Sequence, residues 1–325
     1  MKPNVPLRTA LVGDVGGTNA RFALADLSDP VRPELHDLVQ LPSNASDSLG
    51  AAVTAYLERV AAKPRPRVTA IAVAGPVTDG EVTLTNLSWR ASETELKRCG
   101  FDRARLVNDF RALAAAADAL GERDLDAIGP LLSRVSKAPI VIVGPGTGFG
   151  AAALLGEGDK TIAVAGEGGH IGFSPEDETE MEVLRILMRR FGRVSIERIV
   201  SGPGLVNLYQ SLCEIAGTAA QFTDPRQILA EAARTDGIAR DAVERFCAIF
   251  GAAAGDIALA YGAQGGVLLA GSLSQALKPF LRAGGFRARF EGKGRLAHLV
   301  RTIPTAVITR TDAALLGCAR LAQAL

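Results

Sequence analysis

Short apolar runs alternate along the chain with stretches in which apolar residues recur every three or four positions, a pattern typical of an α/β fold. The runs at 9–12 and 22–25 predict two strands joined by a tight glycine turn. Helical spacing predicts a helix over 49–60 with Ser46 as its N-cap, and Ser92 and Glu95 form a capping-box pattern that opens another helix. Further strands are expected at 68–74, 105–107, 140–143, 151–155, 161–164, 266–270 and 305–309, and further helices at 110–120, 176–191, 203–215, 225–234, 241–261 and 313–324.

Composition narrows the class of protein. The 325 residues, 48% of them hydrophobic, suggest two domains with substantial cores. Lys and Arg number 36 against 35 acidic residues, which gives no electrostatic signature of nucleic-acid binding, and the basic stretch 63–67 is interpreted as a solvated loop. The four cysteines form no Cys-x-x-Cys pair, which favours a reducing compartment over disulfides or structural zinc. The start has no apolar stretch like that of a signal peptide, and 246–263 is interpreted as a buried helix. We therefore expect a cytoplasmic protein that binds no membrane.

The segment 13–21, GDVGGTNAR, lies between the first two predicted strands. Its glycines leave backbone N–H groups unshielded, while Asp14, Thr18 and Asn19 add a carboxylate, a hydroxyl and an amide. Phosphate oxygens need such donors, and a magnesium ion beside them needs a carboxylate. An ordinary hairpin would explain the Gly-Gly pair alone, but the combination favours a phosphate site. We expect Gly17 to require a positive φ.

A second glycine-rich loop, 144–150, follows the strand at 140–143 and lets backbone amides approach another phosphate. Its spacing is not that of the dinucleotide-binding fingerprint, and the chain contains no Walker lysine motif. A flexible loop is the alternative interpretation. Because a Gly-Thr turn follows a strand at both 17–18 and 146–148, a shared phosphate clamp is the better interpretation, and the recurrence suggests two related halves facing one cleft.

Asn108 and Asp109 stand where a predicted strand passes into a helix. An aspartate in such a place is often a helix N-cap. Phosphoryl transfer to an alcohol, however, needs a carboxylate within reach of the attacking hydroxyl, and a neighbouring asparagine can orient the same substrate. From these two residues alone, the cap is the safer interpretation.

Glu167 and His170 are separated by two glycines directly after the strand at 161–164. Metal binding is one alternative, but a single glutamate and histidine provide too few ligands. A solvent-exposed loop is another. A polyol site fits better, because a carboxylate and a ring nitrogen can bind adjacent hydroxyls. Glu197 alone is interpreted as a surface helix charge.

Together these segments resemble the bacterial glucokinase family, in the group outside the repressor-type (ROK) kinases. ROK kinases share the Gly-Gly-Thr turn and a Gly-Glu-x-Gly-His loop, but carry a cysteine zinc motif soon after the histidine, where this chain has Ile171–Pro175 without cysteine. Gly172 stands where some members have an acid, from which we infer no change of substrate. The resemblance covers 10–316 and rests on seven motifs in family order: 11–21, 108–110, 144–148, 166–170, 197–209, 265–271 and 285–294.

The resemblance implies an actin-like, ribonuclease-H-like ATPase fold, with two α/β domains hinged around a sugar cleft. The small domain is expected to comprise 1–118 and a C-terminal helix 311–325, and the large domain 119–310. The implied activity is ATP-dependent phosphorylation of D-glucose to glucose 6-phosphate, the first step of glycolysis, with Mg²⁺.

The resemblance also assigns residues, with Asp109 as the general base. It implies a sugar site formed by Asn108, Asp109, Glu167, His170 and Glu197. It implies phosphate binding by Gly13, Asp14, Val15, Gly16, Gly17, Thr18, Gly146, Thr147 and Gly148. It implies adenosine binding by Gly265, Gly266 and Gly271, with Asp14 as the candidate magnesium ligand.

Three other functions stay open. One is a kinase for another hexose or an amino sugar. A sugar-sensing regulator is disfavoured, because such ROK proteins carry an N-terminal helix-turn-helix and the first strand here begins by Thr9. Chaperone-type or cytoskeletal ATPases do not need Asn108, Asp109, Glu167 and His170 together. Family precedent and apolar helices are compatible with a homodimer.

Overall fold

The computed structural model describes residues 9–62, 64–84, 89–130, 133–135, 137–156 and 160–325. The chain divides into two compact units. One comprises the described residues up to Gly121 together with Arg310–Leu325, and the other comprises Glu122–Thr309. The domain boundaries expected from the sequence, 118/119 and 310/311, lie close to these limits.

A five-stranded sheet, in the order β3-β2-β1-β4-β7, forms the centre of the first unit. β1, β2 and β3 are antiparallel neighbours, whereas β1, β4 and β7 run parallel. The strands are β1 (Thr9–Val15), β2 (Asn19–Asp26), β3 (Glu34–Pro42), β4 (Val68–Val73) and β7 (Arg103–Asn108), beside a small hairpin of β5 (Glu81–Thr83) and β6 (Arg90–Ser92). The helices of this unit are α1 (Leu49–Arg59), α2 (Glu93–Arg98), α3 (Asp109–Ala116) and α12 (Ala313–Gln323).

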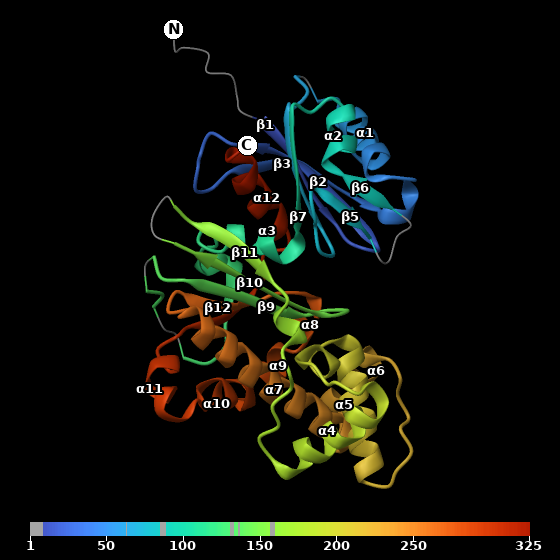
Figure 1. Cartoon of the computed structure of the whole chain (residues 1–325), viewed down its shortest axis with the longest axis vertical. Helices are drawn as coiled ribbons and strands as arrows, with labels where there is room; N and C mark the ends of the chain where they lie inside the picture. The colour runs from blue at the N-terminus through green and yellow to red at the C-terminus, as the bar shows by residue number, and fades with distance from the viewer. Residues whose placement is uncertain (1–8, 63, 85–88, 131–132, 136, 157–159) are drawn as a thin grey trace. The chain divides into compact units, whose positions relative to one another are not determined.

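Helix α12 belongs to this unit although it lies at the far end of the sequence. Figure 1 shows it, in red, beside α3 and the strands near the N-terminus. Its apolar face buries Leu315 and Cys318 in a cluster with Val12 of β1. Gly317 faces the Ala112 carbonyl so closely that a Cβ would collide with it. The two helix backbones are therefore in direct contact, which any side chain at 317 would prevent.

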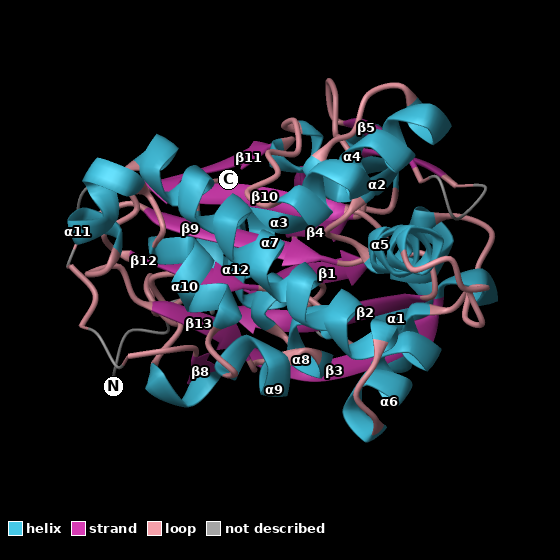
Figure 2. Ribbon diagram, turned by 90° about the horizontal axis from the view of Figure 1, so that it is seen from below, coloured by secondary structure: helices cyan, strands magenta, loops and turns pink. Residues whose placement is uncertain are grey.

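The second unit contains a six-stranded sheet in the order β11-β10-β9-β12-β13-β8. β9, β10 and β11 are antiparallel neighbours, whereas β9, β12 and β13 run parallel (Figure 2). The first five strands of this order repeat the topology of the first sheet, which confirms the two related halves suggested by the sequence. The strands are β8 (Leu125–Ala127), β9 (Ile140–Pro145), β10 (Phe149–Leu155), β11 (Ile162–Gly166), β12 (Gly266–Leu269) and β13 (Thr305–Ile308).

Helix α7 is the central helix of the second unit, and α5, α6 and α10 pack against it. Its buried residues include Phe246 and Phe250, and Phe250 makes an edge-on contact with Phe286. Within the described ranges, no helix is long and apolar enough to cross a membrane. The helices are α4 (Glu178–Phe191), α5 (Gly202–Ile215), α6 (Pro225–Arg234), α7 (Ile238–Tyr261), α8 (Ser272–Ala276), α9 (Lys278–Arg282), α10 (Gly285–Glu291) and α11 (Ala297–Val300).

Two of the predicted helix caps need correction. Ser48, not Ser46, caps α1, and its side chain accepts a hydrogen bond from the Ala51 amide at 3.2 Å. Ser92 does cap α2, but the Glu95 carboxylate accepts from the Gly50 amide of α1 at 2.9 Å. Glu95 therefore satisfies an N-terminal N–H group of a different helix, which local sequence spacing does not reveal.

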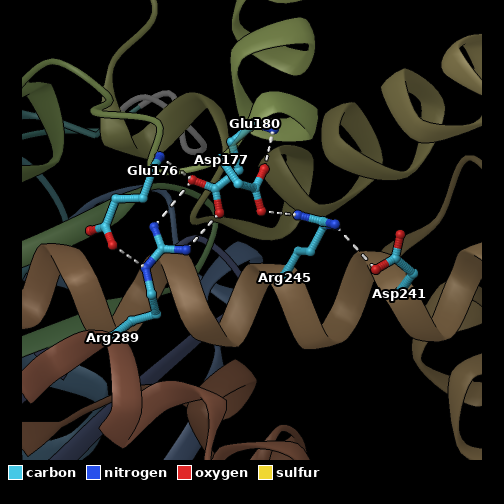
Figure 3. Close-up of polar contacts among 6 residues, drawn as sticks. All are labelled: Glu176, Asp177, Glu180, Asp241, Arg245 and Arg289. Atoms are coloured by element: carbon cyan, nitrogen blue, oxygen red, sulfur yellow. Dashed lines mark hydrogen bonds and ion pairs between the residues drawn. The ribbon is translucent and has the colours of Figure 1, made fainter. Parts of the chain in front are cut away.

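A cluster of ion pairs fixes the beginning of α4 against α7 and α10 (Figure 3). Glu180 is 1% exposed, and its two carboxylate oxygens accept from the Arg289 guanidinium at 2.8 and 3.1 Å. The Glu176 amide adds a further bond to Glu180 at 2.8 Å, and Arg245 of α7 pairs with Asp177 at 2.8 Å. The buried Glu180 carboxylate and the Arg289 guanidinium thus each have a charged partner. Charged groups are tolerated in a core only under this condition.

Candidate functional site

The carboxyl ends of the three parallel strands of the first sheet lie side by side. Val15 of β1 is in register with Val73 of β4, and Val73 is in register with Asn108 of β7. Asp14 and Asp109 therefore lie at the same edge of the sheet. This is the edge at which open α/β sheets bind ligands.

The turn between β1 and β2 is held from both sides. The Gly16 amide donates to the Asn19 carbonyl at 2.9 Å, and Ser43 binds the turn through its hydroxyl to the Gly16 carbonyl (2.7 Å) and its amide to the Thr18 carbonyl (2.9 Å). In the described part of the chain, no hydrogen bond engages the amides of Gly17 and Thr18. These two donors are thus available to an anion.

Three of the expected phosphate residues differ from expectation in their backbone or placement. The expected positive φ at Gly17 is wrong, since the described glycines with positive φ do not include it. Gly13 lies inside the sheet, where a Cβ would stand 3.0 Å from the side chains of Ile71 and Phe22. The Val15 side chain is buried in the core. Gly13 has a packing role within β1, whereas the open donors lie in the turn itself.

Asn108, not Asp109, is the N-cap of α3. Its side-chain oxygen accepts from the Arg111 amide at 3.1 Å, and its NH₂ group donates to the Gly75 carbonyl and to Asp109 Oδ1, at 3.3 and 3.0 Å. Asp109 Oδ1 also accepts from the Phe110 amide at 2.9 Å. The interpretation of Asp109 as a helix cap is therefore wrong, and the hydrogen bonds that it accepts from side chains and amides of other described residues go to Oδ1 and not to Oδ2.

The two carboxylates at this edge have altered proton affinities. Burial raises the pKa of Asp109 to about 6, and the nearby charge of Asp14 raises it too, against the hydrogen bonds from Phe110 and Asn108 that lower it. Burial also raises the pKa of Asp14, while the positive charge of Arg21 opposes the shift. A carboxylate with a pKa near 6 is a stronger base than an exposed one and is still ionised at neutral pH.

The loop 146–148 joins β9 to β10 in the second unit and so corresponds to the 16–18 turn, which joins β1 to β2 in the first. The Gly146 amide donates to the Gly148 carbonyl at 2.8 Å, and the Gly146 carbonyl accepts from the Gly202 amide at 2.8 Å. The amide of Phe149, the residue directly after this loop, donates to Glu197 Oε2 at 2.7 Å. The amides of Thr147 and Gly148 have no partner among the residues described.

The two glycines between Glu167 and His170 have a steric purpose. A Cβ on Gly168 would stand 2.8 Å from the Ala151 Cβ, and one on Gly169 would stand 3.0 Å from the Phe149 Cβ. The loop therefore lies flat on β10, while the flanking side chains of Glu167 and His170 remain exposed. Only glycines allow this arrangement.

Glu197 joins this loop through a short antiparallel pairing. Gly172 bridges Ser195, and the Ile196 amide donates to the Ile171 carbonyl at 2.8 Å. Glu197 and His170 lie in two short helical turns, Ile196–Arg198 and Gly168–His170, that contact each other. The interpretation of Glu197 as a plain surface charge is wrong, because its carboxylate is part-buried and bound to the start of β10.

The expected adenosine glycines separate into two groups. Gly271 follows β12 at its carboxyl end, where a Cβ would lie 3.1 Å from the Pro145 carbonyl oxygen, beside the 146–148 loop. Gly265 and Gly266 lie at the amino end, and the Gly265 amide donates to the Pro139 carbonyl at 3.0 Å. At about 3.3 Å per residue, the five steps from Gly266 to Gly271 separate the groups by about 16 Å. The structure does not bring Gly265 and Gly266 to the loop edge.

Sequence reasoning missed Ser43, which holds the 16–18 turn, and Ser201, which holds the segment 197–202. Ser201 caps α5 by accepting from the Gly204 amide at 2.9 Å, and its hydroxyl donates to the Glu197 carbonyl at 2.8 Å. The Ser-Gly-Pro sequence before a helix is an N-cap signal that could have identified it. Ser43 has no comparable local signal. Among the described residues, no group of three His, Cys, Asp or Glu side chains is placed to hold a metal ion.

Comparison with known proteins defines the class first. The fold is that of the actin-like ATPases, and it is shared with sugar kinases as distant as the ROK family glucokinase from Streptomyces griseus in complex with glucose and AMPPNP (18% identity, TM-score 0.63, covering 98% of this chain and 100% of that one). The crystal structure of glucokinase from an Antarctic psychrotroph is much closer, with 33% identity and a TM-score of 0.89 over 98% and 99% of the two chains.

The family follows from the sequence itself. A family model described as Glucokinase matches residues 11–325. The glucokinase of Caulobacter sp. (strain K31) is 46% identical over 310 residues, 95% of this chain and 93% of the relative. The chain belongs to the glucokinase family.

Proposed function

We propose that this protein transfers the terminal phosphoryl group of ATP to the 6-hydroxyl of D-glucose, producing glucose 6-phosphate and ADP as the first step of glycolysis. The observation that carries the proposal is the Asp109 carboxylate, part-buried at the ligand-binding edge of the first sheet, with a pKa raised to about 6 and one oxygen uncommitted. Family membership supports the choice of donor and sugar.

Asp109 acts as the general base. Its Oδ2 accepts the proton of the 6-hydroxyl while the sugar oxygen forms a bond to phosphorus and the bond to the ADP oxygen breaks. Asn108 keeps Asp109 Oδ1 occupied at 3.0 Å and so fixes the orientation of the carboxylate. The remaining lone pair of the Asn108 side-chain oxygen can accept from a sugar hydroxyl.

Glu167, His170 and Glu197 bind the other sugar hydroxyls. The proposal rests on their positions near the start of β10, where Glu167 and His170 are exposed and Glu197 uses one carboxylate oxygen, Oε2, for the bond to Phe149. A carboxylate accepts from hydroxyls, and an imidazole can donate or accept. Their combination suits a polyol with adjacent hydroxyls.

The nucleotide phosphates are bound by the open amides of Gly17, Thr18, Thr147 and Gly148. Gly271 lies at the same sheet edge as the second loop and admits the adenosine. We assign Gly265 and Gly266 a backbone role instead. A Cβ on Gly265 would stand 2.8 Å from Ile140, and Gly266 has a φ of 121°.

The negative charge at the carboxyl ends of the parallel strands in the first sheet favours binding of a magnesium ion. The charges of Asp14 and Asp109 repel each other, so a cation near Asp14 would relieve the repulsion. Mg²⁺ commonly takes one or two protein carboxylates and completes its shell with waters and substrate phosphates. Asp14 is the residue that would hold it, directly or through water, and the ion would neutralise charge on the phosphates.

A test of the substrate is initial-rate measurement of ADP formation with glucose, mannose, fructose, glucosamine and N-acetylmannosamine, each with ATP and Mg²⁺. We expect glucose to have the highest kcat/KM. A higher value for another sugar would transfer the assignment to that hexose or amino sugar. Nucleotide hydrolysis that no sugar stimulates would reject the kinase proposal.

A cytoplasmic homodimer completes the proposal. Its cytoplasmic location is supported by ATP as the donor and by four cysteines that are all free thiols. The dimer is supported by α4, which exposes Met181, Met188 and Phe191 to between 37% and 51%. Light scattering coupled to size-exclusion chromatography would give twice the 33.9 kDa chain mass, and a single-chain mass would reject the dimer.

A further inference from the structure

Two bonds connect the segment 197–202 to the loop 146–149. Glu197 Oε2 accepts from the Phe149 amide at 2.7 Å, and the Gly202 amide donates to the Gly146 carbonyl at 2.8 Å. Both ends of the glycine loop are thus fixed by one segment. Ser201 stiffens that segment, since its hydroxyl binds the Glu197 carbonyl and its oxygen caps α5.

The same segment is tied to the loop that carries His170. Ile196, directly before Glu197, donates to the Ile171 carbonyl, directly after His170, at 2.8 Å. Glu197 therefore lies between the group that we assign to the sugar and the loop that we assign to the phosphates. Among the residues that the structure describes, none donates to its second carboxylate oxygen, Oε1.

We propose that Glu197 is a positioning residue that couples sugar binding to nucleotide binding. The proposal rests on the function proposed above. A sugar hydroxyl that donates to Oε1 holds the carboxylate in one rotamer, and Oε2 then holds the Phe149 amide and the loop before it. The amides of Thr147 and Gly148 are thereby ordered before the nucleotide arrives.

The expected size of the coupling follows from side-chain order. Glu197 Oε2 is already bound to the Phe149 amide in the ligand-free chain, but its Oε1 has no described donor, so the side chain keeps part of its freedom. Fixing it fully has an entropic cost that the first ligand offsets, and the second ligand then binds without that cost. Relief of most of this cost corresponds to about tenfold tighter binding of the second ligand, or about 1.4 kcal/mol. Linkage requires that nucleotide tighten glucose binding by the same factor.

Gly148 offers a direct way to break the coupling without removing the carboxylate. A Cβ on Gly148 would overlap Glu197 Oε2, so Gly148→Ala must displace that oxygen from the Phe149 amide. Gly172→Ala is the matched control. It makes the same chemical change two residues after His170, where nothing lies within 4 Å of the added methyl group.

The experiment is isothermal titration of the full chain with AMPPNP and Mg²⁺, in the absence and presence of saturating glucose. We expect glucose to lower the Kd of AMPPNP about tenfold in the unchanged protein and in Gly172→Ala, and to leave it almost unchanged in Gly148→Ala. The Kd of glucose alone should rise only about threefold in Gly148→Ala, because the added methyl group displaces the Glu197 carboxylate but leaves Glu167 and His170 in place.

Glu197 variants provide a second test if Gly148→Ala does not fold. Glu197→Ala should abolish the coupling, and Glu197→Gln, which keeps an oxygen acceptor of the same reach, should restore part of it. Unchanged coupling in Gly148→Ala or Glu197→Ala would overturn the inference, as would binding of both ligands to the native chain without coupling. Failure of the native chain to bind glucose would instead overturn the proposed function.

Discussion

Asp109→Asn is expected to remove most turnover and at the same time to stabilise the fold at neutral pH. The amide keeps the size and the hydrogen bonds of the carboxylate but cannot accept the proton, so kcat should fall by about 10²–10⁴-fold. The Kd of glucose should change little. Retention of near-normal kcat would show that Asp109 is not the base.

The stabilisation follows from the sign of the pKa shift. The pKa of Asp109 is 3.8 in its ordinary state and about 6 in the fold, so between these values the folded protein holds the proton more tightly than the unfolded chain. The free energy of unfolding therefore falls as pH rises through this window. The ionised carboxylate costs the fold at most about 3 kcal/mol at pH 7, and about 1–2 kcal/mol after an allowance for partial solvent access. Asp109→Asn removes this cost.

The same shift sets the pH dependence of activity. A base with a pKa of about 6 is half-protonated when the pH equals that pKa and mostly protonated at pH 5. We therefore expect kcat/KM for glucose to fall about tenfold from pH 7 to pH 5. A group with the ordinary value of 3.8 would lose almost nothing over that range. ADP should be measured by chromatography in stopped samples, since coupling enzymes have pH profiles of their own.

Asp102→Asn is the matched control for both measurements, because Asp102 is an exposed aspartate directly before β7 that pairs with Arg67 at 2.7 Å. In Asp102→Asn, kcat/KM should still fall about tenfold from pH 7 to pH 5. A flat profile down to pH 5, or urea unfolding in which Asp109→Asn is less stable than the native chain at pH 7, would refute the assignment of a buried, proton-accepting carboxylate.

Three further predictions address other parts of the molecule. Gly17→Val should fill the space of a phosphate and abolish ATP binding, while glucose still raises the melting temperature; equal loss of both ligands would mean that the turn is structural. Glu167→Gln should raise the KM for glucose by roughly ten- to a hundredfold and the KM for ATP much less, and stoichiometric zinc that is lost in a His170 variant would favour metal binding instead. Glu180→Ala should lower the free energy of unfolding by about 1–3 kcal/mol, since Arg289 loses its buried partner but keeps the ion pair with Glu176 at 2.7 Å, and an unchanged urea midpoint would contradict that.

The strands and long helices follow closely from periodicity. The helix at 225–234 begins and ends where predicted, and the strand pairs around both glycine turns are present. The strand β3, by contrast, has no regular alternation, because it is an edge strand with most of its residues exposed. The short helices α9 to α11 pack on α7, and this packing, more than local spacing, decides their conformation.

The site residues were predictable as types but not as contacts. Asn108 and Asp109 could be recognised as a pair, yet only the fold shows which of them caps α3. Glu197 carries no local signal, because its importance comes from a bond to Phe149, 48 residues away. Gly265 and Gly266 were grouped with Gly271 because a motif in one dimension does not record which end of a strand each residue occupies.

The position of α12 also sets the order in which the protein can be completed during synthesis. The second unit is one continuous segment, whereas the sheet of the first unit is completed by a helix that follows the whole second unit in the sequence. Until α12 leaves the ribosome, the apolar surface that includes Val12 and Ala70 has no cover. Chains truncated after residue 309 and released from the ribosome should therefore leave the N-terminal unit sensitive to protease while the 122–309 segment resists it, although the N-terminal unit is made first.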